Sequence, residues 1–439
     1  MPQVAENDRT DNDRQVAGND RADNDLINEA PSGGFASVRS DFPIFERTPG
    51  GRRLVYLDSG ATSQKPAVVI EAQAEHLRSH NANVHRGVYA LAQEADAAYD
   101  QARTRVARFV NAPAETTIFT KNVTEAINLV AYSWGRANVG PGEAVLITQM
   151  EHHANLVPWQ VLCAERRASL RYLEVDEHGE LSLEQLDAEL ARGDVRLVAL
   201  AHVSNVLGTI NPVAEMVARA RAAGAVTLID GAQAVPQMPV DVTAIGADFY
   251  AWTGHKALGP TGIGVLHGRR ELLEAMGPFL TGGDMIASVD FERATWNELP
   301  FKFEAGTPPI SEAVGLGAAV EYLAGLGMER VRAHELELTG YMLERLAEIP
   351  GLRVVGPPSA ERRGALASFT IDGMHPHDVA ELADRAGVCI RAGHHCAQPL
   401  MRCLGVSATA RASVGVYNDA SDVDALVAAL QAGREVFGL

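Results

Sequence analysis

Apolar segments with strand character alternate with helical patterns through the middle of this chain, and that alternation determines the class of fold. Helical patterns at residues 183–191 and 213–223 lie between strand-like runs at 144–148, 170–175, 195–201, 226–229, 249–252 and 262–266. Strands joined by helices in this order pair as a mostly parallel sheet that helices cover. The sequence therefore predicts an α/β fold.

The sequence changes character on both sides of this region. Residues 1–40 repeat Asn-Asp-Arg, contain few large apolar residues and predict a disordered tail. After residue 309 a long helical stretch, broken near residues 325–327, is followed by short strands and a last helix at 422–436. We therefore expect a tail (1–40), a large α/β domain (41–309) and a smaller α+β domain (310–439).

Composition limits the location and the partners that we expect. No run approaches the ~18 apolar residues of a membrane-spanning helix, and the first residues lack the apolar core of a signal peptide. The 439-residue chain has a formal charge of −18, which argues against nonspecific binding to nucleic acid or anionic membranes. We expect a cytoplasmic protein with reduced thiols, because four cysteines in so long a chain do not resemble a disulfide framework.

Lysine is rare in this chain, which narrows the search for a catalytic amine. Only 4 of the 38 basic residues are lysines. Lys256 stands in a glycine-rich turn, residues 253–262, directly after one apolar strand and before another. A lysine shielded from water at a strand end has a lowered pKa and can form a Schiff base with a carbonyl compound. The alternative for Lys256 is an ordinary surface lysine in a turn.

A carboxylate follows another strand of the same predicted sheet. The strand at 226–229 ends at Asp230, and Gln233 stands just beyond it. Pyridoxal phosphate is an electron sink only while its pyridine nitrogen is protonated, and a carboxylate paired with that nitrogen keeps it so. The alternative for Asp230 is a turn or helix cap. An aspartate and a lysine at strand ends of one sheet together favour the cofactor interpretation.

Four further polar residues stand where a predicted strand or helix begins or ends: His153, Asn205, Thr124 and Arg411. The imidazole of His153 is suited to stacking on a planar ring, with a metal ligand or a loop histidine as alternatives. Thr124 opens a helix and suits either a phosphate site or a simple helix cap. Arg411 can clamp a substrate carboxylate through two parallel hydrogen bonds.

One loop in the smaller domain carries the candidate nucleophile. Cys396 follows His394 and His395, and a thiol beside imidazoles can hold thiolate character. The alternative is half of a zinc site, which His375 and His377 would complete. The remaining cysteines stand in apolar patterns that predict buried side chains: Cys163, Cys389 and Cys403.

These motifs resemble those of group II cysteine desulfurases of the SufS type, which are pyridoxal phosphate enzymes of the class V aminotransferase family. The resemblance covers residues 41–437 and rests on the Lys256 turn, on segments 150–159 and 230–233, and above all on the cysteine loop at 391–401. It implies a pyridoxal phosphate-dependent transferase fold of type I, with a mostly parallel sheet of the seven-stranded type and a smaller α+β domain. It also implies a homodimer that converts L-cysteine to L-alanine. The sulfur passes to an enzyme cysteine as a persulfide and then to a sulfur-acceptor protein for iron–sulfur cluster assembly.

The resemblance assigns a role to each candidate residue. Lys256 holds the cofactor and moves protons, His153 stacks on the ring, and the thiolate of Cys396 attacks the substrate sulfur. Asp230 pairs with the pyridine nitrogen, and Gln233 bonds to the phenolic oxygen. The residues expected around the phosphate are Thr124, Thr253 and His255, with Thr307 from the partner subunit. Those expected around the substrate are Asn205, Arg411 and Arg391. No metal ion is expected.

His377 bears on the choice of partner. The segment 375–378 resembles the branch of the family that delivers persulfide to a zinc-binding scaffold protein, in which this histidine takes over a zinc position. The alternative for His377 is a residue that merely begins a helix. For the whole chain the alternatives are a selenocysteine lyase, or another lyase on the same fold, and a non-catalytic zinc-binding adaptor. The adaptor would leave Lys256 and Asp230 without a role.

Overall fold

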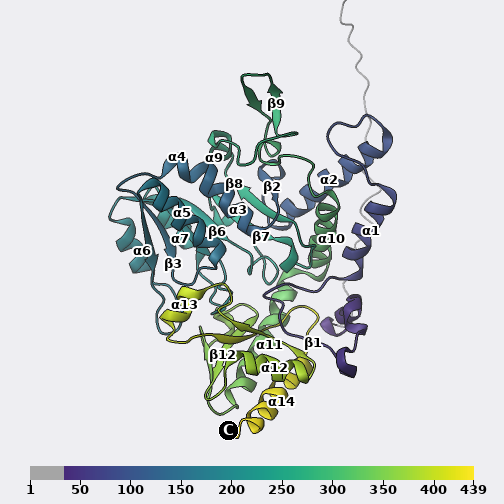
Figure 1. Ribbon diagram of the computed structural model, residues 1–439, viewed down its shortest axis with the longest axis vertical. Helices are drawn as coiled ribbons and strands as arrows, with labels where there is room; N and C mark the ends of the chain where they lie inside the picture. The colour runs from purple at the N-terminus through teal and green to yellow at the C-terminus, as the bar shows by residue number, and fades with distance from the viewer. Residues whose placement is uncertain (1–33) are drawn as a thin grey trace, which may run out of the picture.

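A seven-stranded sheet forms the centre of the larger lobe in the computed structural model, which describes residues 34–439 (Figure 1). Its strands lie in the order β2-β8-β7-β6-β5-β3-β4. All neighbours from β7 to β4 are parallel, whereas β8 runs antiparallel to both β7 and β2. The predicted mostly parallel sheet is thereby confirmed. The strands are β2 (Thr117–Thr120), β3 (Ala144–Thr148), β4 (Ser169–Leu173), β5 (Val195–Ala201), β6 (Val226–Asp230), β7 (Phe249–Thr253) and β8 (Gly264–Gly268).

Helices cover both faces of this sheet because their apolar residues recur at helical spacing. In α7 (Val213–Ala222) the buried residues stand at positions 213, 216, 217 and 220, which share one side of a helix. They join a core that includes α2, α6 and α10, while α3 and α5 pack on the opposite face of the sheet. The bounds are α2 (Ala90–Phe109), α3 (Val123–Val130), α5 (Val157–Arg166), α6 (Leu183–Leu190) and α10 (Ile310–Leu326).

The smaller lobe is built on an antiparallel sheet in the order β11-β12-β15-β14. Apolar residues from this sheet and from three helices form a separate core. The α+β character expected after residue 309 is what these elements show. The strands are β11 (Leu352–Val355), β12 (Leu366–Ile371), β14 (Arg391–Gly393) and β15 (Thr409–Ser413), and the helices are α11 (Met328–Ala347), α12 (Pro376–Arg385) and α14 (Ala420–Val436).

The helical stretch after residue 309 divides between the two lobes. Helix α10 packs on α1 (Ala67–Ser79) and α2, and its buried residues belong to the core of the large sheet. The chain then reverses at Gly327, whose φ of 82° favours glycine, and α11 joins the core of the small sheet. We therefore propose a domain boundary at Gly327 instead of the one expected at residue 310.

The chain segment before α1 contacts both lobes, although the sequence placed it with the large domain: Val38 and Phe42 join the core of the large sheet, whereas β1 joins the smaller lobe. Strand β1 (Val55–Tyr56) pairs with β13 (Val388–Cys389), and Figure 1 shows this N-terminal segment beside α14. Residues 34–41 form a 3-10 helix in which Val38 is buried, so the expected disorder is wrong for residues 34–40. The rest of the predicted tail lies outside the described residues.

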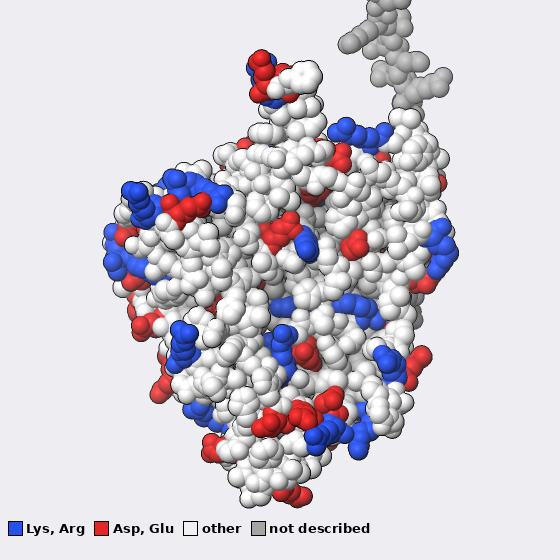
Figure 2. Space-filling view, in the orientation of Figure 1, with Lys and Arg blue, Asp and Glu red and all other residues white. Residues whose placement is uncertain are grey.

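A two-stranded hairpin projects from the larger lobe at the top of Figure 1 and was not predicted. It consists of β9 (Ile286–Val289) and β10 (Ala294–Trp296), and Phe291 at its turn is fully exposed. Figure 2 shows side chains of both charges at this tip and interspersed over the same view of the molecule. Within residues 34–439, every helix is too short or too polar to cross a bilayer.

Candidate active site

The residues predicted at strand ends meet at one edge of the large sheet. Asp230 ends β6, and Lys256 closes a single 3-10 turn (Gly254–Lys256) directly after β7. Because parallel strands present their carboxyl ends on the same side, these residues come together with Asn205, which follows β5. A cavity is lined by His152, Asn205, Asp230, Gln233 and Lys256, with four small or apolar neighbours.

Lys256 carries a neutral amine more readily than an ordinary lysine. Burial lowers the pKa of Lys256 to about 8, while the nearby carboxylate of Asp230 opposes that shift. The cations Arg411 and Arg391 lower the pKa further. A primary amine with a pKa near 8 is nucleophilic close to neutral pH, which Schiff-base chemistry requires.

Asp230 is an acidic group in an environment that disfavours its charge. It is 6% exposed, and burial raises the pKa of its carboxyl group above the usual value. One carboxylate oxygen accepts a hydrogen bond of 3.0 Å from the N–H of Ala232. A cationic ring nitrogen beside the carboxylate would restore its charge, so Asp230 fits the partner expected for pyridoxal phosphate.

The hydroxyl group of Thr253 provides a test of the expected phosphate site. It is buried and has no hydrogen-bond partner among the described residues. Buried polar groups without partners are rare in native proteins and point to a missing ligand. Burial, followed by the charges of Lys256 and Lys65, lowers the pKa of His255 to about 4. A phosphate dianion would satisfy the free hydroxyl and restore the charged form of the imidazole, so these residues fit the group.

His152, and not His153, lines the cavity with Lys256 and Asp230. Burial, followed by the charge of Lys256, lowers the pKa of His152 to about 3. His153 turns to the cysteine loop: its backbone N–H donates to the carbonyl of Cys396 at 2.7 Å, and its Nε2 accepts from the N–H of Gln398 at 3.1 Å. The expectation that His153 stacks on the cofactor therefore needs correction, because consecutive residues of this turn point in different directions.

The cysteine loop joins β14 to α13 (Gln398–Cys403) and holds its thiol at the surface. Cys396 is exposed, and both it and His395 adopt left-handed backbone angles, with φ of 57° and 52°. The backbone carbonyl of His395 accepts a hydrogen bond from the side-chain amide of Asn205 at 2.7 Å. The ring Nε2 of His395 lies 2.8 Å from the hydroxyl of Thr409. These contacts fix a strained loop over the cavity that Asn205 lines.

The other cysteines follow the sequence prediction only in part. Cys163 is buried as predicted, and Cys389 is half-buried. Cys403 is exposed, which contradicts the prediction. It ends the short helix α13, whose buried residues are Leu400 and Met401, so its side chain falls on the solvent side.

Arg411 is positioned as a receptor for an anion. Its side chain is buried on β15, opposite Arg391 in the β14–β15 register. One terminal nitrogen donates to the carbonyl of Asn205 at 2.8 Å and the other to Asp58 at 3.2 Å. The Nε of Arg411 is buried without a partner in the described chain, so it remains available to a carboxylate.

Residues 58–65 connect the candidate residues and were not predicted from the sequence. Asp58 pairs with Arg411, and the carbonyl of Gly60 accepts from the amide of Gln233 at 2.8 Å. Further along, the side chains of Thr62 and Lys65 donate to the carbonyl of His255 at 3.0 and 2.8 Å. The short apolar run that precedes an Asp-Ser-Gly turn was the available signal.

Thr307 and His377 lie away from the cavity. Thr307 is exposed on the loop that precedes α10. His377 is exposed in the first turn of α12, and its ring centre lies 5.1 Å from that of His375. Within the described residues, no three His, Cys, Asp or Glu side chains gather as a metal site. The histidines and the cysteine considered for a zinc site are therefore not brought together.

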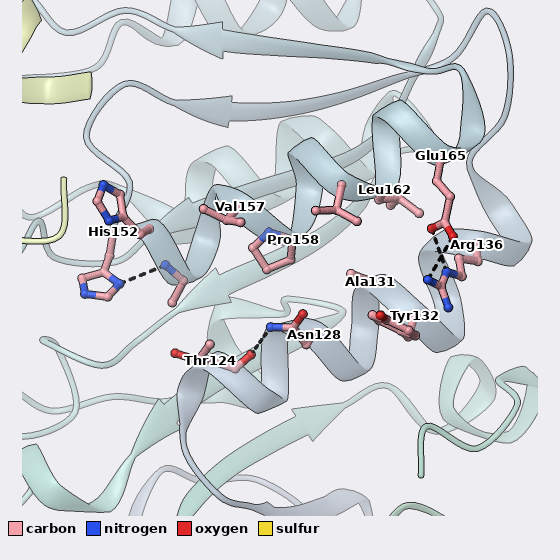
Figure 3. Close-up of a pocket in the computed structure, with 13 residues that line it drawn as sticks. Thr124, Asn128, Ala131, Tyr132, Arg136, His152, Val157, Pro158, Leu162 and Glu165 are labelled. Carbon is pink, nitrogen blue, oxygen red and sulfur yellow. Dashed lines mark hydrogen bonds and ion pairs between the residues drawn. The ribbon is translucent and has the colours of Figure 1, made fainter. Parts of the chain in front are cut away.

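A groove extends from His152 between α3 and α5 (Figure 3). Thr124 stands at the same end of the groove as His152, and the ion pair of Arg136 with Glu165, at 2.9 Å, stands at the other. Apolar side chains along it are half exposed: Tyr132, Val157 and Val161. The helix start at Thr124 thus lies on the same groove as His152, and its role at a phosphate stays a prediction.

Comparison with known proteins gives the family of the chain. The model of the aminotransferase class-V family matches residues 55–426. The chain is 49% identical over 415 residues to a cysteine desulfurase of Haloferax volcanii, covering 91% of this chain and 97% of the relative. Among solved structures, the cysteine desulfurase CsdA of Escherichia coli aligns with a TM-score of 0.84 at 40% identity, covering 92% of this chain and 99% of that one. The apo cysteine desulfurase of Thermococcus onnurineus aligns with a TM-score of 0.87 at 38% identity, covering 92% and 98%. The chain therefore belongs to the class V aminotransferase family, among its cysteine desulfurase members.

Proposed function

We propose that this protein releases sulfur from L-cysteine as a pyridoxal phosphate-dependent cysteine desulfurase, with L-alanine as the other product. The observation that carries the proposal is the position of Lys256 and the Cys396 loop on one cavity. Asn205 lines that cavity and binds the loop through the carbonyl of His395. An amine with a lowered pKa thus lines the cavity, and the loop that carries an exposed thiol is bound to a residue of the same cavity.

When bound, pyridoxal phosphate supplies an electron sink for negative charge at the substrate α carbon. We infer that Lys256 holds it, Asp230 pairs with its ring nitrogen and the imidazole of His152 stacks on its ring. The amide nitrogen of Gln233 already donates to the carbonyl of Gly60, and its amide oxygen accepts from the side chain of Gln237 at 3.2 Å. The second N–H of this amide is left to donate to the phenolic oxygen. Around the phosphate we place Thr124, Thr253 and His255, with Thr307 of a second subunit.

The substrate is bound through its carboxylate. We infer that this group lies on the free Nε of Arg411, near Asn205, with Arg391 adding positive charge from the neighbouring strand. That position directs the α carbon toward Lys256. The Nζ of Lys256 removes the α proton in its neutral form and later returns a proton to the alanine product.

Sulfur transfer uses the exposed thiol of Cys396. As a thiolate, its Sγ attacks the substrate sulfur; a sulfur–sulfur bond forms, and the carbon–sulfur bond of the substrate breaks. The electron pair of the broken bond stays with the β carbon, which a proton then completes to alanine. Cys396 ends the step as a persulfide, and a sulfur-acceptor protein removes the outer sulfur for iron–sulfur cluster assembly.

We further infer a cytoplasmic homodimer and a zinc-binding acceptor that His377 contacts. The half-exposed apolar residues of the α3–α5 groove favour burial by a second copy of the chain. Val161→Asp should then lower the mass measured by sedimentation equilibrium.

His377 is exposed and can therefore contact an acceptor protein. His377→Ala should reduce the turnover that a zinc-loaded scaffold stimulates, while basal turnover stays unchanged. An unchanged stimulated rate would reject that contact.

One experiment tests the activity itself. The purified protein should absorb visible light after loading with pyridoxal phosphate and should form alanine from L-cysteine. Lys256→Ala should abolish the visible band, and Cys396→Ala should abolish alanine formation while keeping the band. Cys403→Ala is the matched control, because this second exposed thiol stands on the adjoining helix. A colourless wild-type protein that forms no alanine would overturn the proposal.

A further inference from the structure

Lys65 is a polar residue that the proposed reaction does not use. Its ammonium group donates to the carbonyl of Ser63 at 2.7 Å, to the carbonyl of His255 at 2.8 Å and to the hydroxyl of Ser63 at 3.3 Å. These contacts use the three N–H donors of a lysine. No carboxylate of the described residues forms an ion pair with it, so the charge is balanced only by carbonyl dipoles.

This arrangement is costly for the fold. Burial lowers the pKa of Lys65 to about 7, which measures how strongly the site disfavours the charge. Lys65 also stands two positions before α1, where the positive end of the helix dipole repels a cation. Lys65 is thus destabilising in two ways, through the burial of its charge and through the helix dipole, although all its N–H groups are hydrogen-bonded. Its role at this position is therefore something other than stability.

Donors from the segment around Lys65 converge on the carbonyl of His255. Besides Lys65, the backbone N–H of Ser63 donates to this oxygen at 3.0 Å, as does the hydroxyl of Thr62 at 3.0 Å. The hydroxyl of Ser63 lies 3.1 Å from the same oxygen and accepts from the N–H of Leu258 at 2.9 Å. Donors from three residues thus hold the peptide that joins His255 to Lys256.

We propose that Lys65 is a positioning residue, which anchors the His255–Lys256 peptide so that the amine and imidazole of these residues meet the cofactor in the required orientation. The inference deepens the proposed function and rests on it. The peptide belongs to a single 3-10 turn, which has little rigidity of its own. Rotation of this peptide would move the Lys256 side chain and the phosphate-binding side chain of His255 together.

A matched lysine provides the control. Lys302 is 6% exposed and donates to two carbonyls, those of Leu273 and Glu274, at 2.8 and 2.9 Å. Neither carbonyl belongs to the candidate site. Lys65→Met and Lys302→Met each remove an ammonium group that binds two carbonyls, so both should lose stability, but only the first should disturb the cofactor.

The test uses the full chain and the affinity of the apoenzyme for pyridoxal phosphate, followed by absorbance. Lys65→Met should raise the dissociation constant roughly tenfold or more, because a hydrogen bond to a charged group is lost at the anchored turn. Amide hydrogen exchange at residues 254–259 should accelerate in the apoenzyme. The loaded variant should show a lower kcat, with the KM for L-cysteine within about twofold of wild type, because the carboxylate site is untouched.

Two results would overturn the inference. One is an unchanged dissociation constant and exchange rate in Lys65→Met. The other is an equal loss of affinity in Lys302→Met, which would indicate general destabilisation. If Lys65→Met fails to fold, Thr62→Val removes one donor to the same carbonyl and should weaken cofactor binding in the same direction. The dissociation constant and the exchange rate do not depend on turnover, so a wild-type enzyme that makes no alanine would reject the proposed function and leave these two measurements as the test.

Discussion

The backbone N–H of His153 donates a hydrogen bond of 2.7 Å to the carbonyl of Cys396, while the neighbouring His152 lines the cavity of Lys256. Adjacent histidines therefore serve different parts of the site. One contacts the loop that carries the thiol, and the other contacts the space for the cofactor. The side chain of His153 also accepts from the N–H of Gln398, at the start of α13.

Substitution of each histidine should separate these parts. His152→Ala should weaken binding of pyridoxal phosphate roughly tenfold, because the ring loses a stacking contact of about 1 kcal/mol together with apolar contact area. His153→Ala should leave the visible spectrum unchanged and lower the rate of sulfur transfer, because the helix that follows Cys396 loses a hydrogen-bond acceptor. Cofactor titration and single-turnover alanine formation measure the two effects. Normal cofactor affinity in His152→Ala would restore His153 as the stacking residue.

The sequence predicted the parts of the site that depend on strand ends. Asp230 and Lys256 were found because an apolar run that stops at a polar residue places that residue at the edge of the sheet. The sequence pattern could not decide whether His152 or His153 faces the cavity, because the direction of a side chain in a turn depends on its backbone angles. The segment of residues 58–65 was missed for a related reason. Two of its side chains, Thr62 and Lys65, bind the main-chain carbonyl of His255, and a sequence does not show which carbonyl a side chain will meet.

The position of the domain boundary likewise could not be predicted from the local sequence pattern. Residues 311–348 appeared as one helical stretch with a break, and the break was located correctly near Gly327. Which lobe each half joins depends on packing: α10 meets α1 and α2, whereas α11 meets the small sheet. Local pattern gives the helix and its end, but the partner that buries it comes from elsewhere in the chain.

The lowered pKa of Lys256 predicts how the apoenzyme responds to pH. In the folded protein the pKa is about 8, and in the unfolded chain it returns toward 10.5. Between these values the unfolded state binds more protons, so the contribution of Lys256 to the free energy of unfolding rises with pH across that window. Chemical denaturation of apo wild type and Lys256→Met from pH 7 to 10 should show a difference that narrows as pH rises. A constant difference would place the pKa of Lys256 at its ordinary value.

Glu304 should be a major determinant of stability. It is buried and accepts two hydrogen bonds from Arg103 at 2.6 and 2.8 Å, one from the hydroxyl of Tyr99 and one from the N–H of Phe119. Glu304→Gln leaves the buried guanidinium without its counter-charge, so we expect a loss of about 3 kcal/mol in the free energy of unfolding. Urea denaturation of the wild type and of Glu304→Gln measures this loss in the free energy of unfolding.

The control for Glu304 is an exposed ion pair. Glu381 pairs with Arg385 on the surface of α12, one helical turn away. Glu381→Gln should change the free energy of unfolding by no more than about 0.5 kcal/mol, because water screens this pair. If Glu304→Gln lowers the free energy of unfolding by no more than Glu381→Gln does, the Glu304 network adds little to stability.

Asp58 should set the affinity for the substrate without setting the affinity for the cofactor. It binds one terminal nitrogen of Arg411 at 3.2 Å, and Asn205 binds the other, which leaves the buried Nε for the substrate carboxylate. Asp58→Asn keeps the size of the side chain and removes its charge. The guanidinium then loses its counter-charge and a strong hydrogen bond, and it becomes free to turn. We expect the KM for L-cysteine to rise about tenfold, with kcat and the dissociation constant of pyridoxal phosphate changed less than about twofold.

Asp372→Asn is the matched control, because this exposed residue follows β12 in the same small sheet. It should leave all three constants unchanged. A fall in kcat at unchanged KM would instead mean that Arg411 does not bind the substrate carboxylate.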